Sequence, residues 1–252
     1  MARQYFGTDG IRGRVNTPPM TAESALRLAI AAARTFAPNG GREVVIGRDT
    51  RRSGQMIEAA LIAGLTSMGL KPVLLGIVPT PTVALMTRET GAALGLMVSA
   101  SHNKSDDNGI KLFSPAGIKL TDAEEEALEA AMASAFEGDF APPPAIATPH
   151  HMNGAIALYL ERCLETVGTD IDFSGLKIVL DCAHGAAFEV GPAALRQLGA
   201  DVTIIGDTPD GLNINAGVGS TATGLLKSTV TETGADIGIA FDGDADRVIV
   251  ID

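Results

Sequence analysis

Short apolar runs separated by helical patterns occupy two sections of the chain. In the first section the pattern predicts strands at Glu43–Gly47, Pro72–Gly76 and Ala92–Val98, and a helix from about Ser53 to Met68 that Ser53 caps. In the second section it predicts strands at Lys177–Asp181, Asp201–Gly206 and Asp236–Phe241, and helices at about Gly185–Leu198 and Thr223–Thr233. Alternation of strands with helices is typical of βαβ units. We therefore expect an α/β fold of two tandem related domains, with mixed, mostly parallel sheets and helices on both faces.

The two sections repeat one another in detail. Gly91–Ser99 aligns with Gly234–Asp242, and this alignment places Ser99–Asn103 where the second section has Asp242–Asp246. Glycines bracket equivalent strands at Gly69, Gly76, Gly199 and Gly206. Open α/β sheets bind ligands at the carboxyl ends of their parallel strands. We expect these two loops, one from each domain, to face each other across a cleft.

A proline-rich stretch marks the boundary between the domains. Before it, Thr121–Glu124 has the pattern of a capping box and predicts a helix through about Ser134. The three prolines of Pro142–Pro144 disfavour helix and predict an extended connector. We expect a first domain at residues 1–140, a linker at 141–150 and a second domain at 151–252.

Composition narrows the class of protein. The formal net charge of −11 argues against nucleic acid as a partner, although a local group of arginines could still bind a phosphorylated substrate. Cys163 and Cys182 lie in apolar stretches without metal-type spacing, which predicts buried free thiols in a reducing compartment. Neither a signal region nor an apolar run of the roughly 18 to 20 residues that a membrane span needs is present. These features predict a cytoplasmic protein without a membrane partner.

Three alternating aspartates form the most informative motif. Asp242, Asp244 and Asp246 directly follow an apolar run, and like charges this close raise one another's pKa unless a cation binds. Carboxylate oxygens suit Mg²⁺. A solvated acidic turn is the alternative, whereas an EF-hand is excluded because Arg247 stands where its loop needs glycine. Arg247 also offers a fixed positive charge for a phosphate or a carboxylate.

A second motif surrounds Ser101. His102 and two lysines, Lys104 and Lys111, lie close in sequence, which is a plausible environment for a nucleophilic serine. The spacing of a nucleophile elbow is absent, and loop serines commonly only cap turns. Asn108-Gly109 predicts a turn that leads into a strand at Ile110–Phe113.

Weaker candidates lie elsewhere in the chain. Arg12, in the glycine-rich stretch Phe6–Gly13, could hold a phosphate in a bidentate manner. The three arginines of Gly47–Gly54 precede a helix start and would attract anions, or else form surface ion pairs. We interpret Pro209–Ser220 as a long ordered loop near the domain junction. For His184, at another strand end, we favour a loop hydrogen-bonder over a catalytic residue.

Together these motifs resemble the α-D-phosphohexomutase superfamily, most closely its bacterial phosphoglucosamine mutases. Four segments carry the resemblance: Phe6–Gly13, Ser99–Lys111, Gly211–Ser220 and Asp242–Arg247. The resemblance implies that phospho-Ser101 donates its phosphoryl group to glucosamine 6-phosphate, passes through a 1,6-bisphosphate and yields glucosamine 1-phosphate. It also implies one Mg²⁺ per active site, held by Asp242, Asp244 and Asp246 with a phosphoserine oxygen, and glucosamine or glucose 1,6-bisphosphate as activator.

The same resemblance assigns further roles. By analogy, Arg12, His102, Lys111 and Arg247 position the phosphoryl group or move protons near it. The relatives often have proline where this chain has Lys104, and His-Pro where it has Ala222-Thr223. They also have four domains, whereas this sequence stops at Asp252. We therefore expect the missing domains III and IV as partners, and little mutase activity from this chain alone.

Several alternatives stay open at this stage. Within the superfamily, a phosphomannomutase or phosphoglucomutase fits the same motifs. A phosphatase or phosphotransferase with Asp242 as an aspartyl nucleophile would not need Ser101. A non-catalytic module that binds Mg²⁺ or a phosphosugar would carry no phosphate on serine. The sequence also leaves open whether the chain forms a homodimer.

Overall fold

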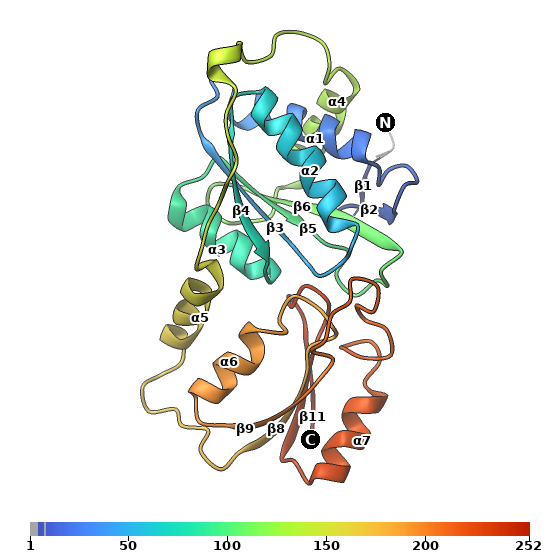
Figure 1. Cartoon of the computed structure of the whole chain (residues 1–252), viewed down its shortest axis with the longest axis vertical. Coiled ribbons are helices and arrows are strands. Elements are labelled where there is room, and N and C mark those ends of the chain that lie inside the picture. The colour runs from blue at the N-terminus through green and yellow to red at the C-terminus, as the bar shows by residue number, and fades with distance from the viewer. Residues whose placement is uncertain (1–4, 8) are drawn as a thin grey trace.

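The computed structural model describes residues 5–7 and 9–252 and shows two α/β domains, one above the other along the long axis (Figure 1). Met1–Gln4 and Thr8, the latter inside the glycine-rich stretch Phe6–Gly13, lie outside the described residues. The helix α5 (Ala155–Thr166) lies between the domains, where it contacts α3 (Thr80–Thr90) of the first and α6 (Val190–Gln197) of the second. The α/β class and the tandem arrangement predicted from the sequence are confirmed.

The first domain is built on a mixed sheet. Within the described residues the sheet has seven strands in the order β1-β2-β6-β5-β3-β4-β7, where β3, β4, β5 and β7 run parallel and β6 and β2 run antiparallel to their neighbours. Its strands are β1 (Phe6–Gly7), β2 (Gly10–Arg14), β3 (Glu43–Arg48), β4 (Lys71–Ile77), β5 (Leu94–Val98), β6 (Asp107–Phe113) and β7 (His150–His151). Its helices are α1 (Ala22–Phe36), α2 (Gly54–Ser67), α3 (Thr80–Thr90) and α4 (Asp122–Ala133).

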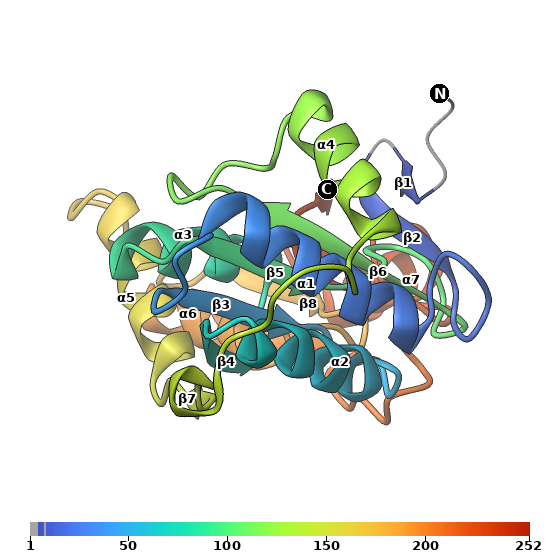
Figure 2. The same ribbon diagram turned by 90° about the horizontal axis from the view of Figure 1, so that it is seen from above.

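Helices cover both faces of this sheet. The helices α1 and α2 lie side by side and pack with α4 on one face, and α3 packs on the other (Figures 1 and 2). Alternate residues of β3 follow the two faces: Val44 and Ile46 belong to the core under α1 and α2, and Val45 to the core under α3. All three are fully buried, as expected for a central strand.

The second domain repeats this plan on a smaller scale. Its sheet has the order β11-β10-β8-β9 in the part of the chain described. The elements are β8 (Lys177–Asp181), α6 (Val190–Gln197), β9 (Asp201–Ile205), α7 (Gly224–Thr233), β10 (Ile237–Phe241) and β11 (Val248–Ile251). Leu226 of α7 packs with Val179 and Ala240, whereas Gly191 of α6 lies against Leu180 and Phe241 on the opposite face.

The repeat between the domains extends to strand order and direction. The strands β6-β5-β3-β4 correspond to β11-β10-β8-β9, with the same parallel and antiparallel pairings. The helices before β5 and β10 both end at a left-handed glycine, Gly91 with φ 65° and Gly234 with φ 63°. Equivalent strand ends therefore carry Ser99–Asn103 and Asp242–Asp246, as the sequence alignment predicted.

The predicted turn at Asn108-Gly109 is wrong, because both residues lie within β6. Asn108 pairs with Gly13 and Gly109 with Arg12 of β2. A Cβ at Gly109 would lie 2.5 Å from the carbonyl oxygen of Ser99 and 2.7 Å from that of Ile11. Glycine is therefore needed for close strand packing, and the actual turn is formed by the residues before Asp107.

Other local predictions also need correction. Ser53 caps no backbone N–H of α2, and its Oγ accepts from Asn108 Nδ2 instead. The helix predicted from Gly185 begins only at Val190. The connector contains a 3₁₀ turn at Pro143–Ala145 rather than being extended throughout. Cys182 is buried but Cys163 is only half-buried, and both are free thiols.

The segment after the connector first returns to the first domain. His150–His151 forms the edge strand β7 beside β4, and α5 follows. The division of the chain at residues 140 and 150 stays a prediction. Within the described residues, no helix combines the length and the apolar character that a membrane span requires.

Candidate functional site

The loops after β5 and β10 meet at the domain junction. Ser101 Oγ donates a hydrogen bond of 2.5 Å to Asp242 Oδ2, across 141 positions of sequence. Ser101 is fully buried and has a left-handed backbone with φ 51°, which is uncommon for a residue with a Cβ. Its backbone N–H is held by Ser99 Oγ at 2.9 Å. The loop therefore presents the serine hydroxyl directly to the acidic cluster.

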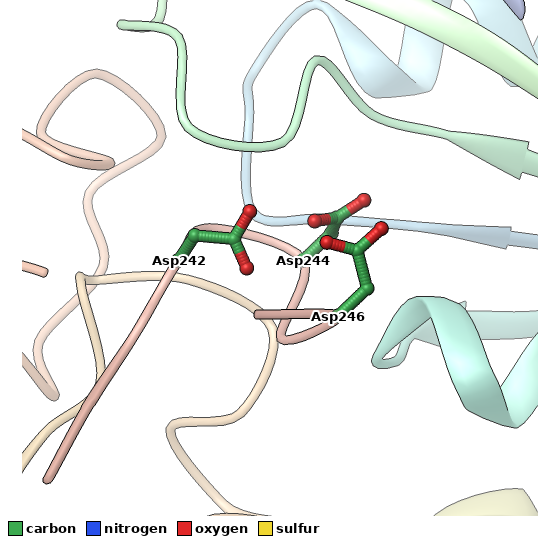
Figure 3. A group of neighbouring side chains, drawn as sticks. All are labelled: Asp242, Asp244 and Asp246. Carbon is green, nitrogen blue, oxygen red and sulfur yellow. The ribbon is translucent and has the colours of Figure 1, made fainter. Parts of the chain in front are cut away.

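The three aspartates of the second loop converge on one point (Figure 3). Asp242, Asp244 and Asp246 each offer an oxygen, and these oxygens lie within 4.8 Å of one another. Asp242 and Asp244 are fully buried. Asp244 Oδ1 has no hydrogen-bond partner among the described residues, although a buried carboxylate oxygen normally has one. Three converging carboxylates, one of which has a buried oxygen without a hydrogen-bond partner among the described residues, fit a hard divalent cation such as Mg²⁺.

The first domain holds Asp244 in place through Thr80 at the start of α3. Thr80 Oγ1 donates to Asp244 Oδ2 at 2.6 Å, and the backbone N–H of Thr80 donates to the carbonyl oxygen of Asp244 at 2.8 Å. The N-terminus of a helix favours a negative charge nearby. Sequence analysis missed Thr80, because only the packing of the two domains brings it to the acidic loop.

Lys111 lies among the carboxylates. Its Nζ is 3.1 Å from Asp244 Oδ2, 2.7 Å from Asp246 Oδ2 and 3.3 Å from Asp9 Oδ2. Burial alone would lower the pKa of Lys111, but the nearby carboxylates outweigh burial and raise the pKa above its usual value. Lys111 therefore stays positively charged. Arg12 contacts the same cluster from its edge, through an ion pair with Asp9 at 3.3 Å.

His102 links the serine to Arg247. Its Nδ1 lies 3.4 Å from Ser101 Oγ and 3.0 Å from Arg247 Nη1. Because the guanidinium can only donate, Nδ1 accepts that hydrogen bond and the proton of a neutral ring is on Nε2. Burial and the charges of Arg247 and Arg12 lower the pKa of His102. The ring is therefore neutral near pH 7 and can accept a proton.

Asp242, which accepts the hydrogen bond of the Ser101 hydroxyl, is destabilised in its ionised form. Burial, with the charges of Asp244 and Asp246, raises the pKa of Asp242 to about 6. Burial also opposes ionisation of Asp244, but Lys111 and Thr80 outweigh it and lower the pKa of that carboxyl. The cluster thus holds negative charge that a bound cation would stabilise.

Two of the three arginines of Gly47–Gly54 are bonded within the protein, so of the two alternatives the sequence left open, Arg48 follows the ion-pair one. Arg51 is fully buried and bonds Asp49 and four backbone carbonyl groups of the loop and strand start at 101–107. Arg48 pairs with Glu58 at 3.3 Å. Arg51 therefore supports the serine loop from behind, a role that sequence analysis missed although its motif lies at the end of β3.

The Pro209–Ser220 loop lies at the junction, as expected. Asn215 Nδ2 donates to the carbonyl oxygens of Ser101 and Asn103, both at 2.9 Å. His184 accepts a hydrogen bond from the backbone N–H of Thr208 at 3.2 Å, which agrees with its interpretation as a loop hydrogen-bonder.

The structure thus brings most of the predicted site residues together. Side-chain contacts join the following residues into one cluster: Arg12, Ser101, His102, Lys111, Asp242, Asp244, Asp246 and Arg247. Arg12 reaches the others only through Asp9. The catalytic and metal-binding roles of these residues remain predictions.

The chain is similar to known proteins along its whole length. Residues 3–139 match the family model of phosphoglucomutase/phosphomannomutase, alpha/beta/alpha domain I, and residues 157–252 match that of domain II. The phosphoglucosamine mutase of Hyphomonas neptunium is 73% identical over 252 residues, which are 100% of this chain and 56% of that protein. That of Jannaschia sp. is 52% identical, with the same two coverages. The chain spans about half the length of the curated relatives it matches.

Solved structures show the same likeness. A phosphoglucomutase/phosphomannomutase family protein from Burkholderia thailandensis superposes with a TM-score of 0.83 at 26% identity, over 100% of this chain and 55% of that one. The putative phosphomannomutase from Thermus thermophilus gives 0.82 at 30% identity, over 99% and 57% of the two chains.

Proposed function

Because this chain belongs to the phosphoglucomutase/phosphomannomutase family, we propose that it forms the part of a phosphohexomutase that carries the nucleophile and the metal ligands. The observation that supports this most strongly is the hydrogen bond of 2.5 Å from Ser101 Oγ to Asp242 Oδ2 between the two domains. Curated relatives named phosphoglucosamine mutase support the glucosamine phosphates as substrates, rather than mannose or glucose phosphates.

The proposed reaction uses Ser101 in its phosphorylated form. The bond between phosphorus and Ser101 Oγ breaks as a bond forms to the 1-hydroxyl oxygen of glucosamine 6-phosphate, and a neighbouring base accepts the hydroxyl proton. The product of this step is a 1,6-bisphosphate. After it reorients, the bond between phosphorus and the sugar O6 breaks as a bond forms to Ser101 Oγ. O6 takes back the proton that the base accepted, and glucosamine 1-phosphate leaves.

The neighbours of Ser101 divide the remaining tasks by charge. His102 is neutral near pH 7, and its Nδ1 is 3.4 Å from Ser101 Oγ. Once Arg247 Nη1 turns from Nδ1 to a phosphoryl oxygen, Nδ1 is free to accept a proton at the site of transfer. Lys111 stays charged, and both Lys111 and Arg247 would position the phosphoryl oxygens. Arg12 would contribute from the edge of the cluster, where it is anchored by Asp9.

A metal ion fits the acidic cluster. Asp242, Asp244 and Asp246 would hold Mg²⁺ together with an oxygen of phospho-Ser101. When bound, Mg²⁺ supplies positive charge that stabilises the transferring phosphoryl group. The unpartnered Oδ1 of Asp244 supports this assignment independently of the relatives.

Mass spectrometry of the intact chain tests the proposal. After incubation with Mg²⁺ and glucose 1,6-bisphosphate, the chain should gain one phosphate, which peptide mapping places on Ser101. Ser101→Ala should abolish this gain. Ser105→Ala, four positions along the same loop, is the matched control and should still be labelled. An acyl phosphate on Asp242, released by hydroxylamine, would instead favour the aspartyl phosphotransferase. Mg²⁺ binding without any labelling would favour the non-catalytic module.

We further infer that the chain alone turns over glucosamine 6-phosphate slowly. The relatives are nearly twice as long, so groups that bind the non-reacting end of the sugar are expected in the part that this chain does not match. Binding energy far from the reacting atoms is needed to orient the substrate for transfer. Turnover at a rate typical of enzymes, with a kcat on the order of 10 per second, would contradict this inference.

A further inference from the structure

Side chains from both domains donate hydrogen bonds to the same two backbone oxygens of the Ser101 loop, residues 99–107. The carbonyl oxygens of Ser101 and Asn103 accept from Arg51 Nη2, at 3.0 and 2.8 Å. The same two oxygens accept from Asn215 Nδ2, each at 2.9 Å. Arg51 belongs to the first domain and Asn215 to the second.

From the first domain, the guanidinium of Arg51 bonds the loop and Asp49 with all of its donors, and no ligand takes part. Arg51 Nε donates to Asp49, and its Nη1 and Nη2 donate to the carbonyl oxygens of residues 101, 103, 104 and 107. Each of the five N–H groups of the guanidinium is therefore used. This side of the loop is fixed within its own domain.

From the second domain, these two carbonyl oxygens are bonded by one side chain, the closely packed Asn215. Asn215 is 5% exposed, has a left-handed backbone with φ 55°, and donates its own N–H to the carbonyl oxygen of Ala183 at 2.9 Å. A Cβ added to Gly243 of the acidic loop would lie 2.8 Å from Asn215 Nδ2 and 2.7 Å from the carbonyl oxygen of Ser101. Asn215 thus contacts the serine loop and lies directly beside the acidic loop.

We propose that Asn215 is a positioning residue, which sets the Ser101 loop against the acidic loop across the domain junction. It is placed to act through the backbone of Ser101 and Asn103, because its hydrogen bonds go to their carbonyl oxygens. The position of Ser101 therefore depends on the packing of the second domain against the first. This inference rests on the proposed function, in which Ser101 carries the phosphoryl group.

Asn215→Asp tests the proposal in the 252-residue chain. The carboxylate has the same shape, but an oxygen replaces the Nδ2 donor and faces two carbonyl oxygens. The matched control is Asn213→Asp in the same loop, where Nδ2 donates to the carbonyl oxygen of Thr208 within that loop. Asn215→Ala, which adds no charge, serves as the second variant if the first does not fold.

Two readouts separate positioning from general damage. The first is the rate of Ser101 phosphorylation as a function of glucose 1,6-bisphosphate concentration. In Asn215→Asp the maximal rate should fall at least about tenfold, since two hydrogen bonds are lost, while the half-saturating concentration changes less than about twofold. The second is hydrogen exchange of residues 101–107, where the N–H groups of Asn103 and Asp107 are bonded within the loop. These should exchange faster in Asn215→Asp but not in Asn213→Asp.

The outcomes also distinguish this proposal from the function on which it rests. Wild-type labelling rate together with unchanged exchange in Asn215→Asp would overturn the positioning role. Equal effects of the two Asp variants would overturn it as well, because the change would then reflect charge in the loop. If wild-type Ser101 takes up no phosphate, the proposed function fails, and exchange alone decides whether Asn215 holds the loop.

Discussion

The two domains place different chemistry on equivalent strand ends. After β5, Ser99, Ala100 and Ser101 open a loop in which Arg51 donates to four backbone carbonyl oxygens between residues 101 and 107. After β10, the equivalent positions are Asp242, Gly243 and Asp244, where negative charge is concentrated and the pKa of Asp242 is raised to about 6. The serine loop is held by neutral hydrogen bonds and a buried guanidinium, with Asn215 added from the second domain, whereas the acidic loop keeps negative charge that its neighbours do not fully balance.

This difference shows how one scaffold can separate two tasks. The serine loop is preorganised by neutral carbonyl groups and one buried guanidinium, so its geometry does not depend on a ligand. The acidic loop keeps uncompensated charge, which Lys111 balances only in part and a cation could balance further. Removing the support of each loop should therefore have different consequences, which three changes can measure.

Removal of Arg51 should have the largest effect on stability. Arg51→Met leaves the fully buried Asp49 without its cationic partner and removes one donor from each of four backbone carbonyl groups. Burial already raises the pKa of Asp49, which then keeps only the Ser99 hydroxyl and a backbone N–H as donors. Loss of one partner of a buried ion pair costs about 3–5 kcal/mol. Urea unfolding should show a loss of that size in metal-free protein and in Mg²⁺ alike. Arg52→Met, at the exposed neighbouring position, should stay within about 0.5 kcal/mol of wild type. Equal stabilities of the two variants would show that the serine loop does not depend on its guanidinium.

The acidic loop should instead respond to pH and to metal. The folded-state pKa of Asp242 is about 6 and its ordinary value is 3.8, so the folded protein binds the proton more tightly. The resulting stability is complete below about pH 3.8 and is lost as the pH rises through about 6, a change of at most about 3 kcal/mol. In EDTA, Asp242→Asn should match wild type near pH 4 and exceed it by up to that amount at pH 8.

Titration with Mg²⁺ provides the control for this prediction. At pH 8 a saturating concentration should stabilise wild type, because the ion binds the folded state, and should stabilise Asp242→Asn much less. Other buried carboxyls with raised pKa values, such as Asp49 and Asp181, titrate in both proteins and cancel in the difference. If the unfolding free energies of wild type and Asp242→Asn differed by the same amount at every pH from 4 to 8, the pKa of Asp242 would not be raised by folding.

Features that local sequence encodes were predicted correctly. The strands, the tandem repeat and the equivalence of the two loops follow from apolar periodicity and from recurring glycines such as Gly91 and Gly234. Asn108-Gly109 misled because its intrinsic turn preference is overridden by pairing with β2, which lies almost a hundred residues earlier. The turn preference of Asn-Gly is outweighed here because β6 is paired on both sides, with β2 and with β5.

The support of the site was not predictable in the same way. Whether Arg51 attracts anions or is buried depends on where the carbonyl groups of residues 101–107 fold back, some fifty residues away. Thr80 and Asn215 acquire their partners only when the two domains pack. The chemistry-bearing side chains are therefore visible in the sequence, while the residues that orient them depend on long-range contacts.

The smallest predicted effect concerns the one position where the two loops differ only by a methyl group. Ala100 is fully buried and accommodates its Cβ, but a Cβ at the equivalent Gly243 would lie 2.7 Å from both the carbonyl oxygen of Ser101 and Ile214 Cδ1. The first contact is with backbone that Arg51 and Asn215 hold, so the acidic loop must move instead. Gly243→Ala should cost about 1–3 kcal/mol and weaken Mg²⁺ binding measured by calorimetry. Gly224→Ala, where a Cβ meets nothing within 4 Å, should change neither quantity appreciably. Unaltered Mg²⁺ affinity in Gly243→Ala would show that the two loops are coupled less tightly than their contact implies.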